Sequence, residues 1–254
     1  MGMPAEGEWV LLLDKSGNKY LVRVEDRQFQ TNLGVLNLGE LKKLDFGQVL
    51  RSHLGEEFWI LPPSLPDFFE KQLRRVPQVV LPKDAAQVVA HTGVGPGDVV
   101  VDGGTGSGWL AIFLGNLVRP DGRVYTYEVR EDFAKVAEEN IRKVGLEEII
   151  TIKRKDIYQG IDEKEVDLVT LDVPEPHLVV PHAEQALRVG GYLAAFTPCI
   201  ETLQLLYQAL RARRFAELKT IECLVREILV RPHATRPSTE MIAHTSYLTF
   251  ARRI

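Results

Sequence analysis

The 254-residue chain has few of the side chains that build disulfide scaffolds or metal sites. Its two cysteines, Cys199 and Cys223, are too few for a disulfide framework and lack the C-x-x-C spacing of zinc sites. The six histidines are scattered along the chain without an H-E-x-x-H motif. We therefore expect no metal site and two buried thiols, with a single structural or intersubunit disulfide as the alternative.

Long apolar runs are also lacking. No stretch of about 18 apolar residues, the length that crosses a bilayer, occurs in the chain. Residues 1–8 lack the basic and apolar segments of a secretory signal. With 45% apolar and 26% charged residues, the composition is typical of a globular protein. We expect a cytoplasmic protein that does not bind a membrane.

An excess of positive charge is lacking, since 31 Lys and Arg face 35 Asp and Glu, and the net charge of −4 argues against a nucleic-acid binder. The charge is uneven, however. Residues 211–254 hold nine Lys or Arg and four Asp or Glu, a net charge of +5, so residues 1–210 carry −9. A basic region on an acidic body can follow a phosphate backbone. Scattered, solvated arginines explain the charge pattern equally well.

The most informative segment that is present is residues 99–108, an apolar run that ends in an acid and a glycine-rich turn. Gly104, Gly106 and Gly108 alternate, so the backbone can adopt positive φ values and approach a ligand closely. The apolar segment from Trp109 onward predicts a helix whose first N–H groups face that ligand. The pattern predicts a nucleotide-type cofactor at the carboxyl end of a strand in an α/β sheet.

The chain divides into a small β unit and a longer region of alternating strands and helices. In the first part, we expect strands at 9–13, 20–24, 31–38 and 58–61, a helix at 66–76, and a second helix that Asp84 caps. After residue 98, we expect strands at 99–103, 124–128, 149–152, 166–171 and 192–196, and helices from Trp109, at 131–143 and at 177–188. Gly190-Gly191 is expected to turn the chain into the strand at 192–196.

This alternation predicts a Rossmann-like, doubly wound α/β sheet with helices on both faces, preceded by a small N-terminal β domain. We assign residues 1–63 to the N-terminal β domain, 64–84 to a linker helix and segment, and 85–254 to the sheet domain.

Three acidic residues, Glu128, Asp156 and Asp172, each follow a predicted parallel strand. Because the carboxyl ends of parallel strands share one edge of a sheet, these carboxylates and the glycine turn should border one crevice. A carboxylate there can accept hydrogen bonds from ribose hydroxyls or from an adenine amino group. The sequence therefore predicts an acidic nucleoside site.

The sequence pattern is compatible with two different cofactors, NAD and S-adenosylmethionine. Residues 106–111 fit the dinucleotide pattern G-x-G-x-x-A, and Glu128 lies at the distance expected of a ribose ligand in NAD enzymes. Counting Asp102, however, four carboxylates around one pocket would repel a pyrophosphate and accept a ligand with sulfonium and ammonium charges. This charge pattern favours S-adenosylmethionine over NAD.

The motifs of the sheet domain resemble, in order, those of class I S-adenosylmethionine-dependent methyltransferases. They are residues 100–108, Tyr127-Glu128, Lys155-Asp156-Ile157, Leu171–Pro176 and Gly190-Gly191-Tyr192. Over nearly its whole length the chain more narrowly resembles the tRNA (adenine-58-N1)-methyltransferase family of archaeal type. The segments that carry this narrower resemblance are 51–55, 82–85, 172–176, 197–199, 231–232 and 243–245.

The resemblance implies transfer of the methyl group of S-adenosylmethionine to N1 of adenine 58 in the tRNA T loop, with adenine 57 as a further target. It also implies a homotetramer and a final pair of antiparallel strands. Asp172 is the implied catalytic residue. The implied cofactor-binding residues are Val80, Asp102, Gly104, Thr105, Gly106, Ser107, Gly108, Glu128, Val129, Asp156, Ile157 and Asp172. The implied substrate-binding residues are Leu81, Phe196, Arg236 and His244.

The roles of the acids follow from the same resemblance, with Glu128 on the cofactor ribose, Asp156 on its adenine, and Asp172 between the methionine end and the target base. Adenine N1 carries an in-plane lone pair, so a carboxylate that orients the N6 amino group and favours the cationic product suffices. Because N1 lies on the pairing edge, the base must leave its tertiary pairing to be received in a pocket.

Two positions depart from the family pattern. Leu81 stands where an aromatic or histidine side chain is common, and Phe196 stands where the family has tyrosine. These two positions motivate one alternative function, a non-catalytic tRNA-binding subunit on the same fold. A methyltransferase that acts on proteins or small molecules is the other alternative.

Overall fold

The computed structural model describes residues 2–76 and 78–254. The chain forms two compact units, the first ending at Arg74 and the second extending from Arg75 to Ile254. Helix α1 (Leu65–Lys71) belongs to the first unit. The rest of the predicted linker, from Arg75 onward, belongs to the second unit.

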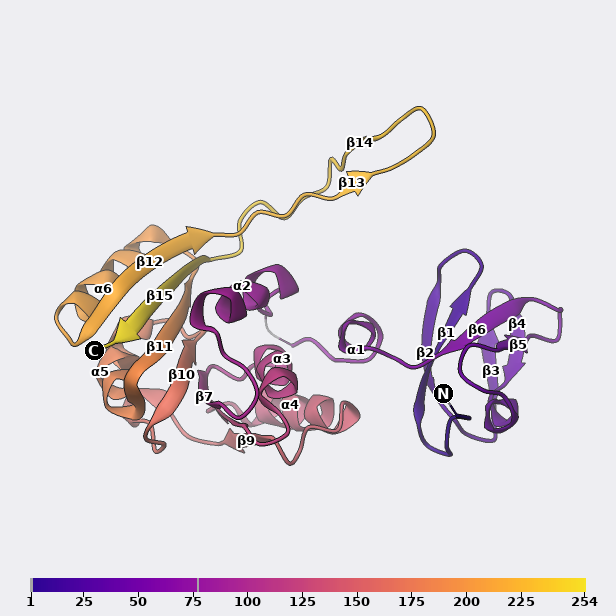
Figure 1. The fold of residues 1–254 in the computed structure, drawn as a ribbon, viewed down its shortest axis with the longest axis horizontal. Coiled ribbons are helices and arrows are strands. Elements are labelled where there is room, and N and C mark those ends of the chain that lie inside the picture. The colour runs from indigo at the N-terminus through magenta and orange to yellow at the C-terminus, as the bar shows by residue number, and fades with distance from the viewer. Residues whose placement is uncertain (1, 77) are drawn as a thin grey trace. The chain divides into compact units, whose positions relative to one another are not determined.

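The first unit contains a four-stranded antiparallel sheet in the order β2-β1-β6-β5 (Figure 1). Asp14 closes the predicted hairpin, because its carboxylate accepts hydrogen bonds from the backbone N–H groups of Ser16 and Asn18 at 2.8 and 2.9 Å. Buried side chains such as Leu12 and Phe58 form the core. The strands are β1 (Trp9–Asp14), β2 (Lys19–Arg23), β5 (Val49–Arg51) and β6 (Glu57–Leu61).

Two elements of this unit differ from prediction. The strand expected at 31–38 is wrong, because Gly34, at a φ of 108°, follows a turn between β3 (Gln28–Thr31) and β4 (Gly34–Asn37). A 3₁₀ helix, η1 (Leu38–Lys43), comes next. Helix α1 is shorter than predicted, and its end is held by Gln72, whose side-chain amide donates to the Leu21 carbonyl at 2.9 Å.

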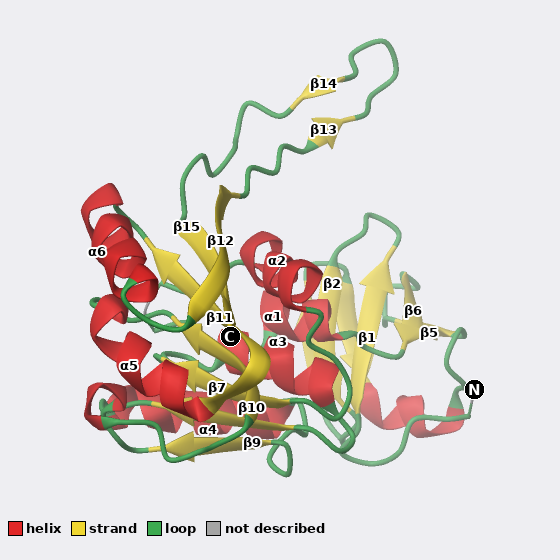
Figure 2. Ribbon diagram, turned by 60° about the vertical axis from the view of Figure 1, so that its left-hand side comes forward, coloured by secondary structure: helices red, strands yellow, loops and turns green. Residues whose placement is uncertain are grey.

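The second unit is built on a seven-stranded sheet in the order β12-β15-β11-β10-β7-β8-β9 (Figure 2). Neighbours from β11 to β9 run parallel, whereas β15 runs antiparallel to both β11 and β12. The strands are β7 (Val99–Gly103), β8 (Arg123–Tyr127), β9 (Ile150–Lys153), β10 (Val166–Leu171), β11 (Leu187–Thr197), β12 (Phe215–Glu222) and β15 (Tyr247–Arg253).

Helices cover both faces of this sheet. Helices α5 (Pro176–Ala186) and α6 (Ile200–Arg211) pack together and share one apolar core with the sheet. On the other face, α2 (Pro82–Thr92) contacts β11 and β15, α3 (Trp109–Val118) contacts β7, β8 and β9, and α4 (Glu131–Lys143) contacts β9. The predicted fold class, a Rossmann-like sheet preceded by a small β region, is confirmed.

Three local predictions for the second unit were wrong. Asp84 does not cap α2, since Leu81 holds the N-cap position and Asp84 lies in the first turn with its carboxylate buried. The Gly190-Gly191 pair lies within β11, which already begins at Leu187 beside Val166. Neither thiol is buried, because Cys199 is exposed and Cys223 is half-buried, and both are unpaired.

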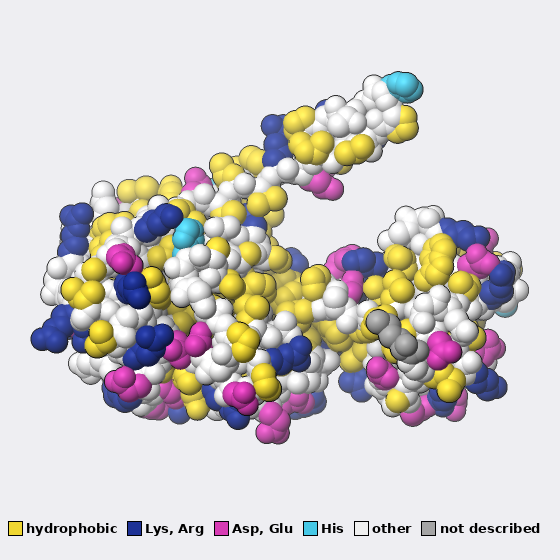
Figure 3. All heavy atoms as spheres, viewed as in Figure 1, with side chains coloured by type: hydrophobic (Ala, Val, Ile, Leu, Met, Phe, Trp, Pro, Cys, Tyr) yellow, Lys and Arg dark blue, Asp and Glu magenta, His cyan; other side chains and the backbone are white. Residues whose placement is uncertain are grey.

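Between β12 and β15 the chain leaves the sheet as residues 223–246, which we call the excursion (Figure 1). Its distal part pairs β13 (Ile228–Leu229) with β14 (Arg236–Pro237). Apolar side chains lie along its surface (Figure 3). Six large ones are exposed, namely Leu224, Val225, Ile228, Val230, Met241 and Ile242. Over the described ranges, none of the helices combines the length and apolar character that crossing a membrane requires.

Candidate active site

The site lies where the strand order of the large sheet reverses. The chain proceeds from β7 to β8 and β9 on one side and then returns to place β10 on the other side of β7. The segments that follow β7 and β10 meet there, and the Asp172 N–H donates to the Gly103 carbonyl at 2.8 Å. Such a reversal leaves a crevice at the carboxyl ends of the strands, where open α/β sheets bind ligands.

The glycine turn is packed tightly against the end of β10. Gly104 has a φ of 96°, and a Cβ added to it would lie 2.2 Å from the backbone oxygen of Asp172. Gly108 also has a positive φ, 79°, and begins α3 as its N-cap residue. Glycine is therefore required at position 104 both for the backbone conformation and for the close approach of two chain segments.

Asp102 lies beneath the glycine turn and does not line the cavity. Its two carboxylate oxygens accept hydrogen bonds from the hydroxyls of Thr126 and Thr170, each at 2.7 Å. Because the Thr126 proton is committed to Asp102, the Thr105 hydroxyl donates to Thr126, at 2.6 Å. Burial raises the pKa of Asp102 to about 6, although both threonine hydroxyls oppose that rise. Asp102 therefore orients the turn through Thr126 and Thr105.

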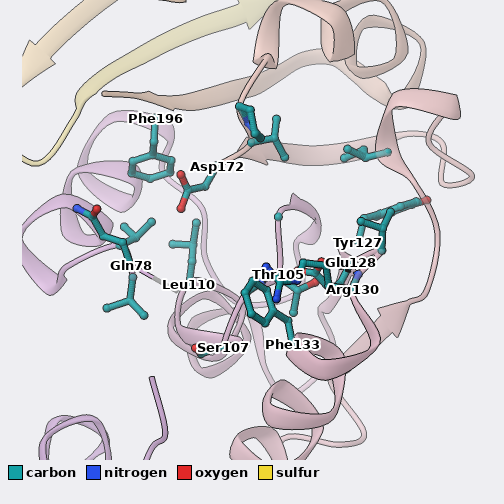
Figure 4. Close-up of a pocket in the computed structure, with 18 of the residues that line it drawn as sticks. Gln78, Thr105, Ser107, Leu110, Tyr127, Glu128, Arg130, Phe133, Asp172 and Phe196 are labelled. Atoms are coloured by element: carbon teal, nitrogen blue, oxygen red, sulfur yellow. Dashed lines mark hydrogen bonds between the residues drawn. The ribbon is translucent and has the colours of Figure 1, made fainter. Parts of the chain in front are cut away.

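A cavity of about 580 Å³ lies above the turn. Figure 4 shows Glu128, Arg130 and Phe133 toward one end of it, and Asp172 and Phe196 toward the other. A smaller cavity of about 150 Å³ adjoins it, and both Asp172 and Phe196 line the two cavities. Asp172 thus borders a space large enough for a nucleoside cofactor and a second space beside it.

The carboxylate of Glu128 is buried and held in place by the backbone. Its two oxygens accept hydrogen bonds from the N–H groups of Gly106 and Arg130, each at 2.9 Å. Asp156 is similarly fixed, since it caps the 3₁₀ helix η2 (Ile157–Gln159) by accepting from the Tyr158 N–H at 2.9 Å. A carboxylate has about four lone-pair positions, so both acids retain capacity to accept from ligand hydroxyls or amino groups.

Asp172 faces the cavity directly. Its carboxylate is accessible from inside, but the surrounding protein displaces enough water to raise its pKa to about 6, and the negative charge of Asp102 adds to the rise. A bound cation would favour the ionised form of this group.

The acids also dominate the charge of the larger cavity. Two cations line it, but Arg130 pairs with Asp132 at 2.7 Å and Lys155 pairs with Asp162. Each cation of the lining thus pairs with an acid outside the lining, although Arg130 also interacts electrostatically with Glu128. This set of acceptors and negative charges fits S-adenosylmethionine, which combines ribose hydroxyls, an adenine amino group and positive charge.

Most of the predicted cofactor residues line the larger cavity. They are Val80, Gly104, Thr105, Gly106, Ser107, Glu128, Val129, Asp156, Ile157 and Asp172, together with Phe196 from the predicted substrate set. Asp102, Gly108, Leu81, Arg236 and His244 do not line it. Leu81 is the half-buried N-cap of α2, and Arg236 is exposed on β14 of the excursion.

His244 lies at the base of the excursion and is held by two acceptors. Its Nδ1 is 2.6 Å from the Glu222 carboxylate and its Nε2 is 2.9 Å from the Pro198 carbonyl oxygen. The bond to Glu222 is the main reason that the pKa of His244 is raised, and the contact with Pro198 adds to it. Because both neighbours are acceptors, the doubly protonated ring satisfies both contacts.

Sequence reasoning missed aromatic residues that line the larger cavity. Phe133 of α4 is half-buried and lines the cavity, with the Arg130 guanidinium 3.7 Å from its ring centroid. Tyr127 and Tyr158 also line it. Tyr127 and Tyr158 lie close in sequence to Glu128 and Asp156, which follow strands, and this proximity could have predicted that they line the cavity. Among residues 2–76 and 78–254, no group of three or more His, Cys, Asp and Glu side chains could hold a metal ion.

The chain is similar to known proteins both in sequence and in fold. Residues 58–235 match the family described as tRNA methyltransferase complex GCD14 subunit. The tRNA (adenine(57)-N(1)/adenine(58)-N(1))-methyltransferase TrmI of Methanocaldococcus jannaschii is 35% identical over 95% of this chain and 94% of that protein.

Two solved structures cover nearly the whole chain. The SAM-dependent O-methyltransferase of Thermotoga maritima has a TM-score of 0.90 and 36% identity, over 99% of this chain and 95% of that one. The tRNA (m1A58) methyltransferase TrmI of Aquifex aeolicus has a TM-score of 0.82 and 25% identity, over 100% and 99%. With its glycine turn and acidic cavity on this fold, the chain belongs to the tRNA methyltransferase complex GCD14 subunit family.

Proposed function

We propose that the protein is an S-adenosylmethionine-dependent tRNA methyltransferase that methylates N1 of adenine in the T loop, at position 58 and also at position 57. The observation that carries this proposal is the place of Asp172, which borders both the larger cavity and the smaller one beside it. The Methanocaldococcus relative is described as a methyltransferase of adenines 57 and 58 in tRNA, which supports both the acceptor and the two positions.

In this proposal the larger cavity holds the cofactor. Glu128 accepts hydrogen bonds from the ribose hydroxyls, and Asp156 accepts from the adenine amino group. Phe133 and Tyr158 enclose that end, and the turn from Gly104 to Gly108 supports the methionine part. When bound, S-adenosylmethionine supplies a methyl group on a positively charged sulfur.

The smaller cavity holds the target base. Asp172 accepts a hydrogen bond from the N6 amino group, which directs the N1 lone pair toward the larger cavity. The ionised carboxylate also favours the positive charge that the adenine ring gains when N1 is methylated. Phe196 provides an apolar wall for the unstacked base. In this proposal, Arg236 and His244 contact the tRNA outside this cavity.

A methyltransferase with an oxygen acceptor is the second candidate, because the Thermotoga structure is described as an O-methyltransferase. The two candidates differ in the acceptor atom and in the macromolecule. Transfer of labelled methyl groups to unmodified tRNA transcripts distinguishes them.

We expect the wild-type transcript to accept methyl groups and a transcript with guanosine at positions 57 and 58 to accept none. Transcripts with guanosine at only one of these positions assign the label to each adenine. Equal labelling of the doubly substituted transcript would show that the target lies elsewhere.

We further propose that the protein assembles as a homotetramer through the excursion. Its exposed apolar side chains, on a thin two-stranded segment, are typical of an interaction surface. Sedimentation velocity should give a tetramer for the wild-type protein and smaller species for an Ile228→Asp, Ile242→Asp double variant. A monomeric wild-type protein would refute this assembly.

A further inference from the structure

The excursion is fastened at both of its ends to the start of helix α2. Cys223 begins the excursion directly after β12, and Thr245 lies near its end, before β15. The Nζ of Lys83, in the first turn of α2, donates to the Cys223 carbonyl oxygen and to the Thr245 hydroxyl, each at 2.7 Å. One side chain therefore joins two points that are far apart in sequence.

Asp84 completes this cluster. Its Oδ1 accepts from the Lys83 Nζ and its Oδ2 accepts from the Thr245 hydroxyl, each at 2.8 Å. The three donors of Lys83 are thus used, and the Thr245 hydroxyl both accepts and donates. The side chains of Lys83 and Asp84 are only 12% and 2% exposed. We call Lys83, Asp84 and Thr245 the root clamp.

A buried ion pair is a weak source of stability, because the cost of removing both charges from water offsets their attraction. However, a buried ion pair must have all of its hydrogen bonds satisfied, and this requirement fixes the positions of the side chains involved. The root clamp holds Thr245 in one orientation, and Asp84, Thr245 and Ser246 line the smaller cavity together with Asp172 and Phe196. The residues that close the excursion are therefore also a wall of that cavity.

We propose that Lys83 and Thr245 are positioning residues, which hold the base of the excursion as one wall of the acceptor cavity beside Asp172. The proposal rests on the assignment of the smaller cavity to the acceptor base. The lining of the larger cavity includes Glu128 and Asp156 but none of the three clamp residues. Loss of the root clamp should therefore impair the use of tRNA and spare the binding of the cofactor.

Thr245→Val tests this with little change of shape. The variant removes the hydroxyl that accepts from Lys83 and donates to Asp84. We expect hydrogen exchange to accelerate in the adjoining ends of β12 and β15, where Glu222 pairs with Tyr247. The cofactor dissociation constant measured by calorimetry should stay within about twofold, and kcat/KM for tRNA should fall by about tenfold. The KM for tRNA should rise more than kcat falls.

Thr92→Val is the matched control, because Thr92 ends the same helix and its hydroxyl donates to the Val88 carbonyl at 2.7 Å, away from the excursion. Lys83→Arg should retain part of the activity that Lys83→Met loses, since it keeps the charge and donors. Equal kinetics and exchange in Thr245→Val and the wild type would overturn the proposal. A parallel loss of cofactor affinity would also overturn it, because the clamp would then act on the whole fold.

The exchange measurement is made without tRNA and does not depend on activity. If the wild-type protein methylates no tRNA, the proposed function fails, and accelerated exchange in Thr245→Val would still establish the clamp. If the wild-type protein is active and Thr245→Val is unaffected by both measures, the clamp fails and the function stands.

Discussion

Asp172→Asn is expected to lower kcat for tRNA methylation by about a hundredfold to a thousandfold, the usual effect of removing one group that stabilises developing charge. The amide keeps the size of the side chain but removes the negative charge next to the target base. Its carbonyl oxygen can still accept from the N6 amino group, so the loss of activity reports mainly on the charge. Steady-state kinetics at saturating cofactor separate this loss from a weaker cofactor affinity.

Asp121→Asn provides the control for the Asp172 variant, because Asp121 is an exposed residue of the turn before β8. Its kinetics should match those of the wild type. Activity of Asp172→Asn within about tenfold of the wild type would contradict the proposed role of the carboxylate.

The same residue predicts how the reaction depends on pH. The surrounding protein and the charge of Asp102 raise the pKa of Asp172 to about 6, so the carboxylate loses its charge as the pH falls through that value. The kcat/KM for S-adenosylmethionine, which reports on the cofactor-free enzyme, should therefore fall below pH 6 and reach a plateau above pH 7. Because the pKa of Asp102 is also about 6 and the two carboxyls interact, the midpoint belongs to the pair. A profile that stays flat from pH 5 to 8 would contradict this assignment.

Gly104→Ala is expected to weaken cofactor binding on the order of a hundredfold, because it combines backbone strain with a collision. The φ of 96° is one that alanine rarely adopts, and the added Cβ would lie 2.2 Å from the Asp172 backbone oxygen. The ends of β7 and β10 would have to separate, which displaces both the glycine turn and Asp172. Calorimetry with the cofactor and thermal unfolding measure the two consequences.

Gly97→Ala isolates the cost of the positive φ alone. Gly97 has a φ of 89°, in a turn before β7, but a Cβ there meets no atom within 4 Å. It should lower thermal stability and leave cofactor affinity unchanged. If Gly104→Ala binds the cofactor as well as Gly97→Ala does, the close approach of β7 and β10 is not needed for the site.

Elements with a strong local pattern could be predicted from the sequence. The helix at 131–143 has the predicted bounds because acidic residues begin it and basic residues end it. The strand at 166–171 could be predicted because four of its six residues are valine or leucine and polar segments flank it. By contrast, the run at 31–38 alternates as a strand does, and only the conformation of Gly34 shows that it turns back on itself.

The site residues likewise fall into those that local sequence patterns could predict and those that depend on distant contacts. Glu128, Asp156 and Asp172 could be placed at one edge because the topology of parallel strands brings their ends together. That Asp102 lies beneath the turn depends on Thr126 and Thr170, which come from other strands. Similarly, Asp84 was expected to cap a helix, but its partner Thr245 lies 161 residues away. Contacts over such separations leave no periodic signal in the sequence.

The most direct test of the central claim is the identity of the methylated nucleoside. An unmodified tRNA transcript is incubated with the protein and S-adenosylmethionine, digested, and analysed by nucleoside mass spectrometry. Our account predicts 1-methyladenosine from the T loop. Methylation on a ribose oxygen or on N6 of adenine, or no methylated nucleoside at all, would contradict it.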